Sequence, residues 1–207
     1  MDAHAAAVDQ LAGRTVGDSM SDLQTMIDEL DSLNRWVSTH RLSRWEMCEV
    51  LRETTYPAWR GVVLEIGCHV GDSLAIWREC HRPSLLVGVQ DTDELTVERS
   101  HALSVVRVVG RSQDAETHRR VLAALNGRVV DFLYIDGDHT YDAVRADWRL
   151  YSPLVRRGGV AVLHDAVLQG NDTVDVYRFW PEISARYRTK LIHDPTVPST
   201  GAGVVFL

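Results

Sequence analysis

The feature that most constrains this chain is a regular alternation of short apolar runs and amphipathic segments that begins near Gly61. Short runs rich in β-branched and aliphatic residues are typical of buried strands, and apolar residues at helical spacing separate them. The expected strands are 61–66, 85–89, 105–109, 129–135, 160–163, 188–192 and 204–207. The expected helices are 72–81, 94–101, 117–126, 141–154 and 174–185, and a turn is expected at 156–159. This order predicts an α/β fold with a doubly wound, mostly parallel, seven-stranded Rossmann-like sheet covered by helices on both faces.

The residues ahead of this alternation have a different pattern. Apolar positions recur at helical spacing over 21–37 and again over 43–54. We therefore expect two parts, an N-terminal helical arm or lid over residues 1–58 and the α/β domain over residues 59–207. The apolar helices of the arm could equally form the interface of a homodimer.

Charge and composition exclude several classes of protein. The net charge of −7 argues against a nucleic-acid partner, because binding to phosphates needs an excess of basic residues. We expect no membrane association, since no apolar run approaches the length of a membrane span and the first residues do not resemble a signal peptide. Three cysteines without metal-ligand spacing indicate reduced thiols, so a cytoplasmic location is expected.

Three polar residues follow the expected strand 129–135. Asp136, Asp138 and His139 surround a glycine at the point where the strand ends. Ligands of open α/β sheets bind just outside the carboxyl ends of strands, and carboxylates with an imidazole there suit metal binding or acid–base chemistry. The alternative is that the aspartates cap the following helix and that His139 is solvated. For Asp138 we expect a capping or supporting role.

The first strand leads into a glycine-containing turn, Glu65-Ile66-Gly67-Cys68-His69-Val70-Gly71. Glycines at such a turn let the backbone approach a ligand closely, and the following helix offers free N–H groups. Two glycines do not complete the three-glycine dinucleotide fingerprint, which argues against a nicotinamide-dependent oxidoreductase. The pattern E-x-G-x-x-x-G resembles motif I of class I S-adenosylmethionine-dependent methyltransferases, with His69 in place of the usual middle glycine.

A longer and more specific resemblance covers Asp131 to Asp165. This stretch contains D-F-x-x-I-D-G-D-H-x-Y, then P-L-V-x-x-G-G-V and a strand that ends in His-Asp. It is similar to the metal-dependent O-methyltransferases related to the macrocin and mycinamicin sugar O-methyltransferases and to the cephalosporin-biosynthesis methyltransferase. With the first turn, the resemblance spans about half the chain. It implies methyl transfer from S-adenosylmethionine to a hydroxyl of a small molecule, either a sugar in natural-product biosynthesis or a phenol or catechol.

The resemblance also implies which residues bind the cofactor. In the family an acid at the end of the second strand binds the ribose hydroxyls, whereas this chain has Gln90, so either Gln90 or Asp91 takes that role. Ser112 and Gln113 are expected near the adenine, and Arg111 stands where the family has an acid. The full set of expected cofactor-binding residues is Glu65, Gly67, Cys68, Gly71, Ser73, Gln90, Asp91, Ser112 and Asp136.

The family also holds a divalent cation, which the resemblance assigns to Asp136, His164 and Asp165. Mg²⁺ is the expected cation, with Mn²⁺ as the alternative. His164 departs from the family's Glu-Asp pair, and imidazole suits manganese, iron or zinc better than magnesium. Either His164 is not a ligand, or the metal preference is shifted.

His139 lies three residues after Asp136, at the place of the family's general base. A neutral imidazole can accept the hydroxyl proton as the oxygen attacks the sulfonium methyl group. The competing hypothesis is a non-catalytic or accessory protein that retains the methyltransferase fold. It is favoured by the departures from the family pattern at His69, Gln90, Arg111 and His164.

Overall fold

The computed structural model describes residues 42–54, 61–168, 174–196 and 199–207. The helix expected over 21–37, the boundary expected near residue 58 and most of the expected arm lie outside these residues. The helix expected over 43–54 is present as α3 (Arg44–Thr54).

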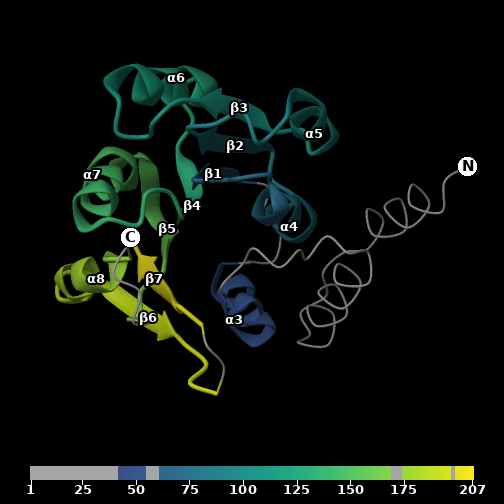
Figure 1. Ribbon diagram of the computed structural model, residues 1–207. Helices are drawn as coiled ribbons and strands as arrows, with labels where there is room; N and C mark the ends of the chain where they lie inside the picture. The colour runs from purple at the N-terminus through teal and green to yellow at the C-terminus, as the bar shows by residue number, and fades with distance from the viewer. Residues whose placement is uncertain (1–41, 55–60, 169–173, 197–198) are drawn as a thin grey trace, which may run out of the picture.

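A single mixed sheet forms the centre of the molecule (Figure 1). Its strands are β1 (Val62–Ile66), β2 (Leu85–Gln90), β3 (Val106–Val109), β4 (Val130–Ile135), β5 (Val155–His164), β6 (Arg188–Ile192) and β7 (Ala202–Phe206). They lie in the order β3-β2-β1-β4-β5-β7-β6, and β1 to β5 pair in parallel. Only β7 runs against its neighbours, which confirms the predicted seven-stranded, mostly parallel sheet.

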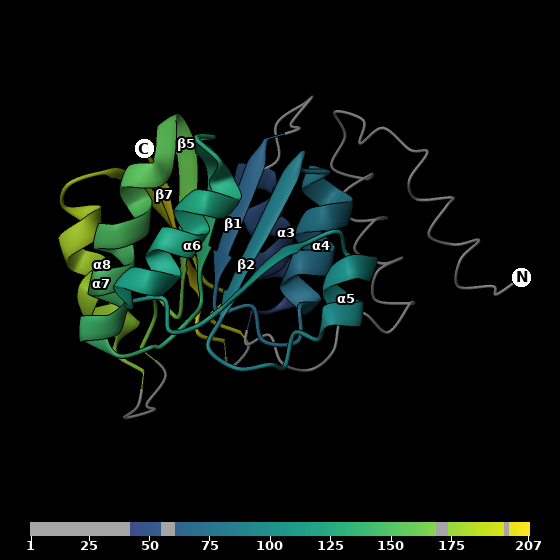
Figure 2. The ribbon, with the colours of Figure 1, turned by 90° about the horizontal axis from the view of Figure 1, so that it is seen from above.

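Helices cover both faces of the sheet, as Figure 2 shows. Besides α3 they are α4 (Asp72–His81), α5 (Val97–Ala102), α6 (Ala115–Leu125), α7 (Tyr141–Tyr151) with the 3₁₀ turn η1 (Ser152–Leu154), and α8 (Val176–Ser184). One hydrophobic core joins α3 and α4 to the face that carries Phe132 and Tyr134. A second core joins α6, α7 and α8 to the opposite face, which carries Leu133 and Ile135. The alternate residues of β4 thus serve both cores, as expected for a strand buried on both sides.

The predicted turn at 156–159 lies within a strand. β5 starts at Val155, which pairs with Val130, and regular pairing resumes with Val160 opposite Phe132. The residues between form an irregularity in which Gly158 has a φ of 75°. The prediction was wrong about the strand boundary because the residue after β7 bonds to this segment: Leu207 donates from its backbone N–H to the carbonyl of Gly159 (3.0 Å).

The half-buried acid that interrupts the β4 run has a structural role. Asp131 accepts a hydrogen bond from the backbone N–H of Val62 (2.7 Å) and pairs with Arg156 at 2.5 Å. It therefore links the starts of β1, β4 and β5 at the edge of the sheet away from the carboxyl ends.

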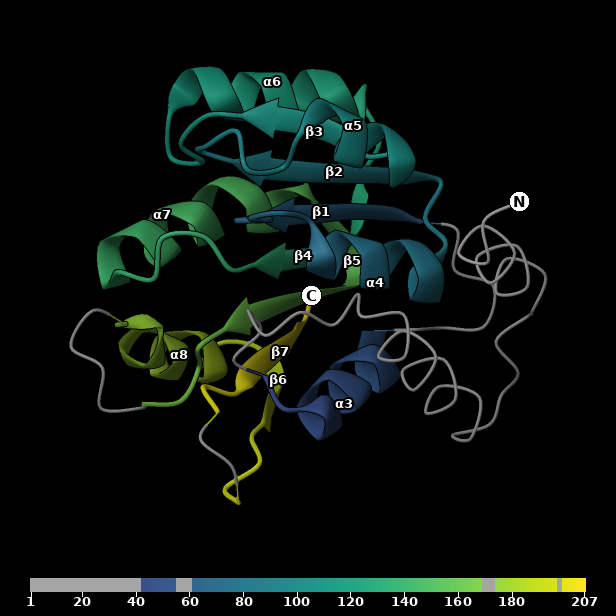
Figure 3. The same cartoon turned by 45° about the vertical axis from the view of Figure 1, so that its right-hand side comes forward.

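Helix α3 lies against β6 and β7 (Figure 3) and is fastened there by Glu46. Ser43 and Glu46 form a capping box: the Ser43 hydroxyl accepts from the Glu46 N–H, and the Glu46 carboxylate accepts from the Ser43 N–H. The same fully buried carboxylate accepts from the Asp194 N–H (2.8 Å) and the Ser199 hydroxyl (2.5 Å). One side chain thus joins the start of α3 to the segment between β6 and β7.

Replacing Glu46 with alanine is expected to lower the free energy of unfolding by about 2–4 kcal/mol, because it leaves several buried donors without an acceptor. Urea denaturation measures this. The matched control is Glu53→Ala on the same helix, where Glu53 pairs with the half-exposed Lys190. We expect that control to cost less than about 1 kcal/mol. Equal losses in the two variants would contradict the role given to Glu46.

Candidate active site

The strand order places one cavity at the carboxyl ends of the central strands. From β1 the chain proceeds outward through β2 to β3, and from β4 outward in the other direction through β5. The turns after β1 and β4 therefore lie side by side at a topological switch point, where α/β sheets bind ligands. A cavity of about 770 Å³ opens there. Its lining includes Gly67, Cys68 and Ser73 after β1, Gln90 and Asp91 at β2, Gly110 and Ser112 after β3, Asp136 and His139 after β4, and His164 and Asp165 after β5.

Gly67 allows the first turn to pack directly against the turn after β4. Its φ is 83°, and a Cβ at this position would lie 2.1 Å from the carbonyl oxygen of Asp136. Two residues on, His69 also adopts the left-handed conformation, with φ 42°. The histidine therefore occupies the backbone conformation that the family's middle glycine favours, at some cost in strain. Its backbone N–H donates to Oε1 of Gln90 at 2.8 Å.

Two of the expected cofactor residues, Glu65 and Gly71, do not line the cavity. Glu65 is fully buried behind the turn, where it accepts hydrogen bonds from the Ser73 hydroxyl and from Trp77 Nε1 (2.8 Å). Burial raises the pKa of Glu65 to about 8. Gly71 is the N-cap residue of α4. Glu65 holds Ser73 in place rather than facing the cavity.

The end of β2 carries an amide and, farther along, an acid. The Nε2 of Gln90 lies 3.1 Å from the Thr92 hydroxyl and 3.3 Å from the Glu94 carboxylate. Glu94 also lies 3.7 Å from the His69 ring. The sequence pattern did not indicate Glu94, because it follows the strand by four residues and reaches back only through the fold of the loop.

Gln113, a residue after β3 that was expected near the adenine, is held by Asp147, a buried acid on α7. Nε2 of Gln113 donates to both carboxylate oxygens of Asp147, at 2.9 and 3.0 Å. Asp147 is fully buried, and burial raises its pKa to about 7. A carboxylate only accepts hydrogen bonds, so the pairing fixes the Gln113 amide with Nε2 toward Asp147 and leaves Oε1 as an acceptor. Sequence reasoning missed Asp147, although an acid on the apolar side of an amphipathic helix was a usable signal.

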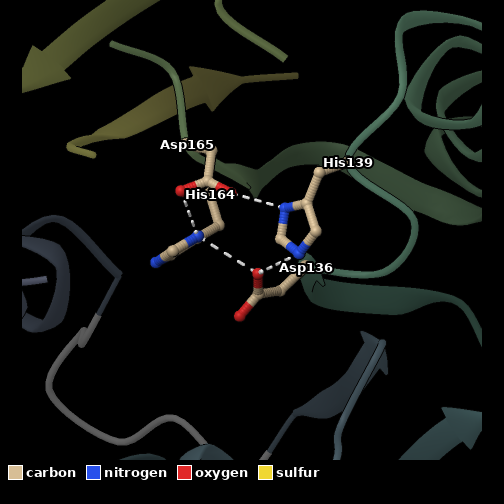
Figure 4. A group of neighbouring side chains, drawn as sticks. All are labelled: Asp136, His139, His164 and Asp165. Atoms are coloured by element: carbon tan, nitrogen blue, oxygen red, sulfur yellow. Dashed lines mark ion pairs between the residues drawn. The ribbon is translucent and has the colours of Figure 1, made fainter. Parts of the chain in front are cut away.

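The ends of β4 and β5 bring four side chains together (Figure 4). Nδ1 of His164 lies 3.1 Å from Oδ1 of Asp136 and 3.0 Å from Oδ1 of Asp165. Nδ1 of His139 contacts Oδ2 of Asp165 at 2.5 Å, and its Nε2 is 3.9 Å from Oδ1 of Asp136. One potential ligand atom from each residue lies within 4.8 Å of all the others. Asp138 is not part of this cluster, since its carboxylate accepts from the Thr140 N–H ahead of α7, as the supporting role predicted.

The charges of the cluster are strongly coupled. Burial lowers the pKa of the His164 imidazole, but Asp136 and Asp165 outweigh it and raise the value to about 10. Burial raises the pKa of Asp165, yet its ion pairs with the His139 and His164 imidazoles hold that pKa well below its usual range. The bond to Asp165 also raises the pKa of His139. Asp165 itself adopts a φ of 60°, a strained conformation of the kind that proteins keep at functional sites.

Comparisons with known proteins show which family and which solved structures this chain resembles. Residues 64–166 match the family model described as a methyltransferase domain. The uncharacterized protein R132 of Acanthamoeba polyphaga mimivirus is 31% identical over 112 residues, which are 49% of this chain and 50% of that protein. This chain therefore spans about half the length of that curated relative.

Several solved structures share the fold. MycE, a methyltransferase of the mycinamycin biosynthetic pathway solved with Mg, SAH and mycinamycin VI, has a TM-score of 0.60 at 19% identity and covers 100% of this chain and 61% of its own. A putative caffeoyl-CoA O-methyltransferase from Staphylococcus aureus has a TM-score of 0.60 at 14% identity, with 98% of each chain covered. TomG from Streptomyces achromogenes, an O-methyltransferase solved with SAM, has a TM-score of 0.55 at 16% identity over 100% of this chain and 99% of its own.

The family-model match, together with the fold and the glycine turn beside the switch-point cavity, identifies a methyltransferase domain of the class I, S-adenosylmethionine-dependent type. The match covers residues 64–166, about half the chain. None of the helices in the described part of the chain is long and apolar enough to cross a membrane.

Proposed function

We propose that the protein transfers the methyl group of S-adenosylmethionine to a hydroxyl of a small molecule, with a divalent cation at Asp136, His164 and Asp165 and with His139 as the general base. The observation that carries this proposal is the convergence of those four side chains at the cavity that the glycine turn also lines. The acceptor class is a sugar hydroxyl of a natural product, or a phenol or catechol. MycE, a methyltransferase of the mycinamycin biosynthetic pathway with bound Mg, SAH and mycinamycin VI, supports the natural-product alternative.

The cavity fits the cofactor. Its volume of about 770 Å³ falls in the usual range for small-molecule sites. Gly67 lets the first turn pack directly against the turn after β4, and both turns line this cavity. S-adenosylmethionine supplies an electrophilic methyl group: the acceptor oxygen forms the new C–O bond, and the C–S bond breaks with its electron pair remaining on sulfur.

The cluster fits a divalent cation. Oδ1 of Asp165 and both ring nitrogens of His164 are buried without a hydrogen-bond partner among the described residues, although the ion pairs given above remain. Buried polar atoms in this state are costly, and a cation between the carboxylates would satisfy Oδ1 of Asp165 and Nδ1 of His164. A divalent cation, when bound, lowers the pKa of a hydroxyl and orients it.

His139 is suited to accept the proton through one particular nitrogen. Because Nδ1 faces the Asp165 carboxylate at 2.5 Å, that nitrogen carries the hydrogen and Nε2 keeps its lone pair. Nε2 points toward Asp136, on the inner side of the cluster (Figure 4). We propose that the hydroxyl proton passes to Nε2 as the C–O bond forms.

The direct test is transfer of a radiolabelled methyl group from S-adenosylmethionine to a panel of vicinal diols, sugars and catechols, with and without EDTA. The proposal expects label in at least one acceptor and loss of that signal in EDTA. Transfer that persists in EDTA would overturn the cation dependence. Cofactor binding with no transfer to any acceptor under any metal condition would favour the accessory protein.

We also propose a cytoplasmic location, which three buried thiols support: Cys48, Cys68 and Cys80.

Asp147→Asn is expected to weaken S-adenosylhomocysteine binding about tenfold, because asparagine presents a donor to the Gln113 amide and disturbs its orientation. If Oε1 of Gln113 accepts from the adenine amino group, the variant should lose less affinity for S-inosylhomocysteine, which lacks that group. Isothermal titration with both ligands measures this. Asp142→Asn, exposed on the same helix, is the control. Equal losses for the two ligands would contradict the orienting role.

A further inference from the structure

We propose that His164 makes the cation site selective for a transition-metal ion of the manganese-to-zinc series over Mg²⁺, by supplying a nitrogen ligand between Asp136 and Asp165. This inference rests on the cation of the proposed function and names its chemical class. It concerns the one residue of the cluster that is neither a carboxylate nor the proposed base.

The position of His164 leaves it little freedom to avoid a bound cation. It is the last residue of β5, where it pairs with Ala202 of β7, and its side chain is only 4% exposed. The ring packs edge-on near Tyr134, with centroids 6.3 Å apart. A side chain fixed by a central strand and closed off from solvent cannot turn outward to make room for water molecules. Any ion shared by Asp136 and Asp165 therefore meets this ring.

The ring also presents the correct atom. Figure 4 shows Nδ1 directed into the space between the two carboxylates, while Nε2 points away from the cluster. The Nδ1 distances to the two Oδ1 atoms are 3.1 and 3.0 Å. Ligand atoms that share one ion at bonds of about 2.1 Å lie about 3 Å apart at adjacent corners of its coordination shell. Nδ1 of His164 is thus spaced from each of the two carboxylate oxygens as one ligand is from its neighbour around a shared ion.

This donor set distinguishes between cations. Mg²⁺ demands a small octahedral shell of oxygen ligands and usually keeps several waters, so a buried imidazole in its shell is unfavourable. Imidazole nitrogen suits manganese, iron, cobalt and zinc, which also accept carboxylate oxygen. The site therefore combines two carboxylates with an imidazole. This donor set favours a transition-metal ion, because Mg²⁺ prefers oxygen ligands alone.

The experiment compares Mn²⁺ and Mg²⁺ on the metal-free full chain and on His164→Glu, which converts the set to carboxylates alone. Most N/O sites bind transition metals more tightly than Mg²⁺, so the change in the affinity ratio is the informative quantity. Isothermal titration gives the dissociation constant for Mg²⁺ divided by that for Mn²⁺. We expect this ratio to be at least tenfold lower in His164→Glu than in the wild type. His101→Glu, an exposed histidine on α5, should leave the ratio unchanged.

A spectroscopic readout identifies the ligand itself. Electron spin-echo modulation of bound Mn²⁺ should show coupling to an imidazole ¹⁴N that disappears in His164→Glu and in His164→Gln, and that persists in His139→Gln. The glutamine variant covers the case in which glutamate prevents folding, and circular dichroism checks both. Nitrogen coupling that survives in both His164 variants, or an unchanged affinity ratio, would overturn the proposal. Failure of the proposed function is separate: it appears as absent methyl transfer, or as transfer that persists in EDTA.

Discussion

Asp136→Ala is expected to lower kcat for methyl transfer by about 10³-fold or more, because losing one carboxylate of the cation site removes several kcal/mol of stabilisation from the reacting oxygen. Affinity for S-adenosylhomocysteine should change by less than about threefold, since Asp136 meets the glycine turn through its backbone: its N–H donates to the carbonyl of Ile66 at 2.8 Å. The two quantities are measured by steady-state kinetics and isothermal titration on the same preparation.

The nearby Asp138→Ala is the informative comparison for that loss. The Asp138 carboxylate accepts from the Thr140 N–H and lies outside the four-residue cluster. We expect it to lower kcat by less than about tenfold, because it removes a turn contact and no cation ligand. If Asp136→Ala retained activity at the level of Asp138→Ala, the cation mechanism would be wrong.

His139→Ala is expected to lower kcat by about 10²- to 10⁴-fold, the usual contribution of a positioned general base. Cofactor affinity should remain nearly intact, because the imidazole contacts Asp165 and faces Asp136 rather than the glycine turn. His139→Gln offers a hydrogen bond to Asp165 without a basic nitrogen, so it should be as inactive as the alanine variant. Steady-state kinetics at saturating cofactor measures both.

The control for His139 is His101→Ala, an exposed histidine on α5, which should be fully active. Full activity in both His139 variants would show that proton removal does not depend on this residue. Activity in His139→Gln alone would indicate a positioning residue that orients Asp165, instead of a base.

Much of the fold was predictable from local pattern. The β-branched run that becomes β4 is buried on both faces, and each of its ends coincides with the sequence prediction within one residue. The start of β5 was not predictable, because Gly158 and Gly159 have the composition of a turn and only the distant Leu207 holds them beside β4. Long-range pairing decided that boundary.

The candidate site, too, was predictable only where local sequence pattern places its residues. Asp136, His139, His164 and Asp165 follow strand ends, where chain order and the sheet rule bring side chains together, and the structure does place them in one cluster. Glu94 and Asp147 were missed, since each reaches its partner only through a loop or a helix face that the pattern does not specify. The acid within the buried face of α7 was the available signal, and Glu46 within the buried face of α3 is a second instance.

The most direct test of the central claim, that this chain binds S-adenosylmethionine at the Gly67 turn, is isothermal titration of the full chain with S-adenosylhomocysteine. We predict one binding site per chain, with affinity reduced at least about tenfold in Gly67→Ala, whose methyl group would meet the Asp136 carbonyl. Gly127→Ala is the matched control, because Gly127 also has a positive φ but an added methyl group there would meet no described atom within 4 Å. Its binding should equal that of the wild type. No binding heat with the wild-type chain, or equal binding by Gly67→Ala, would contradict the account.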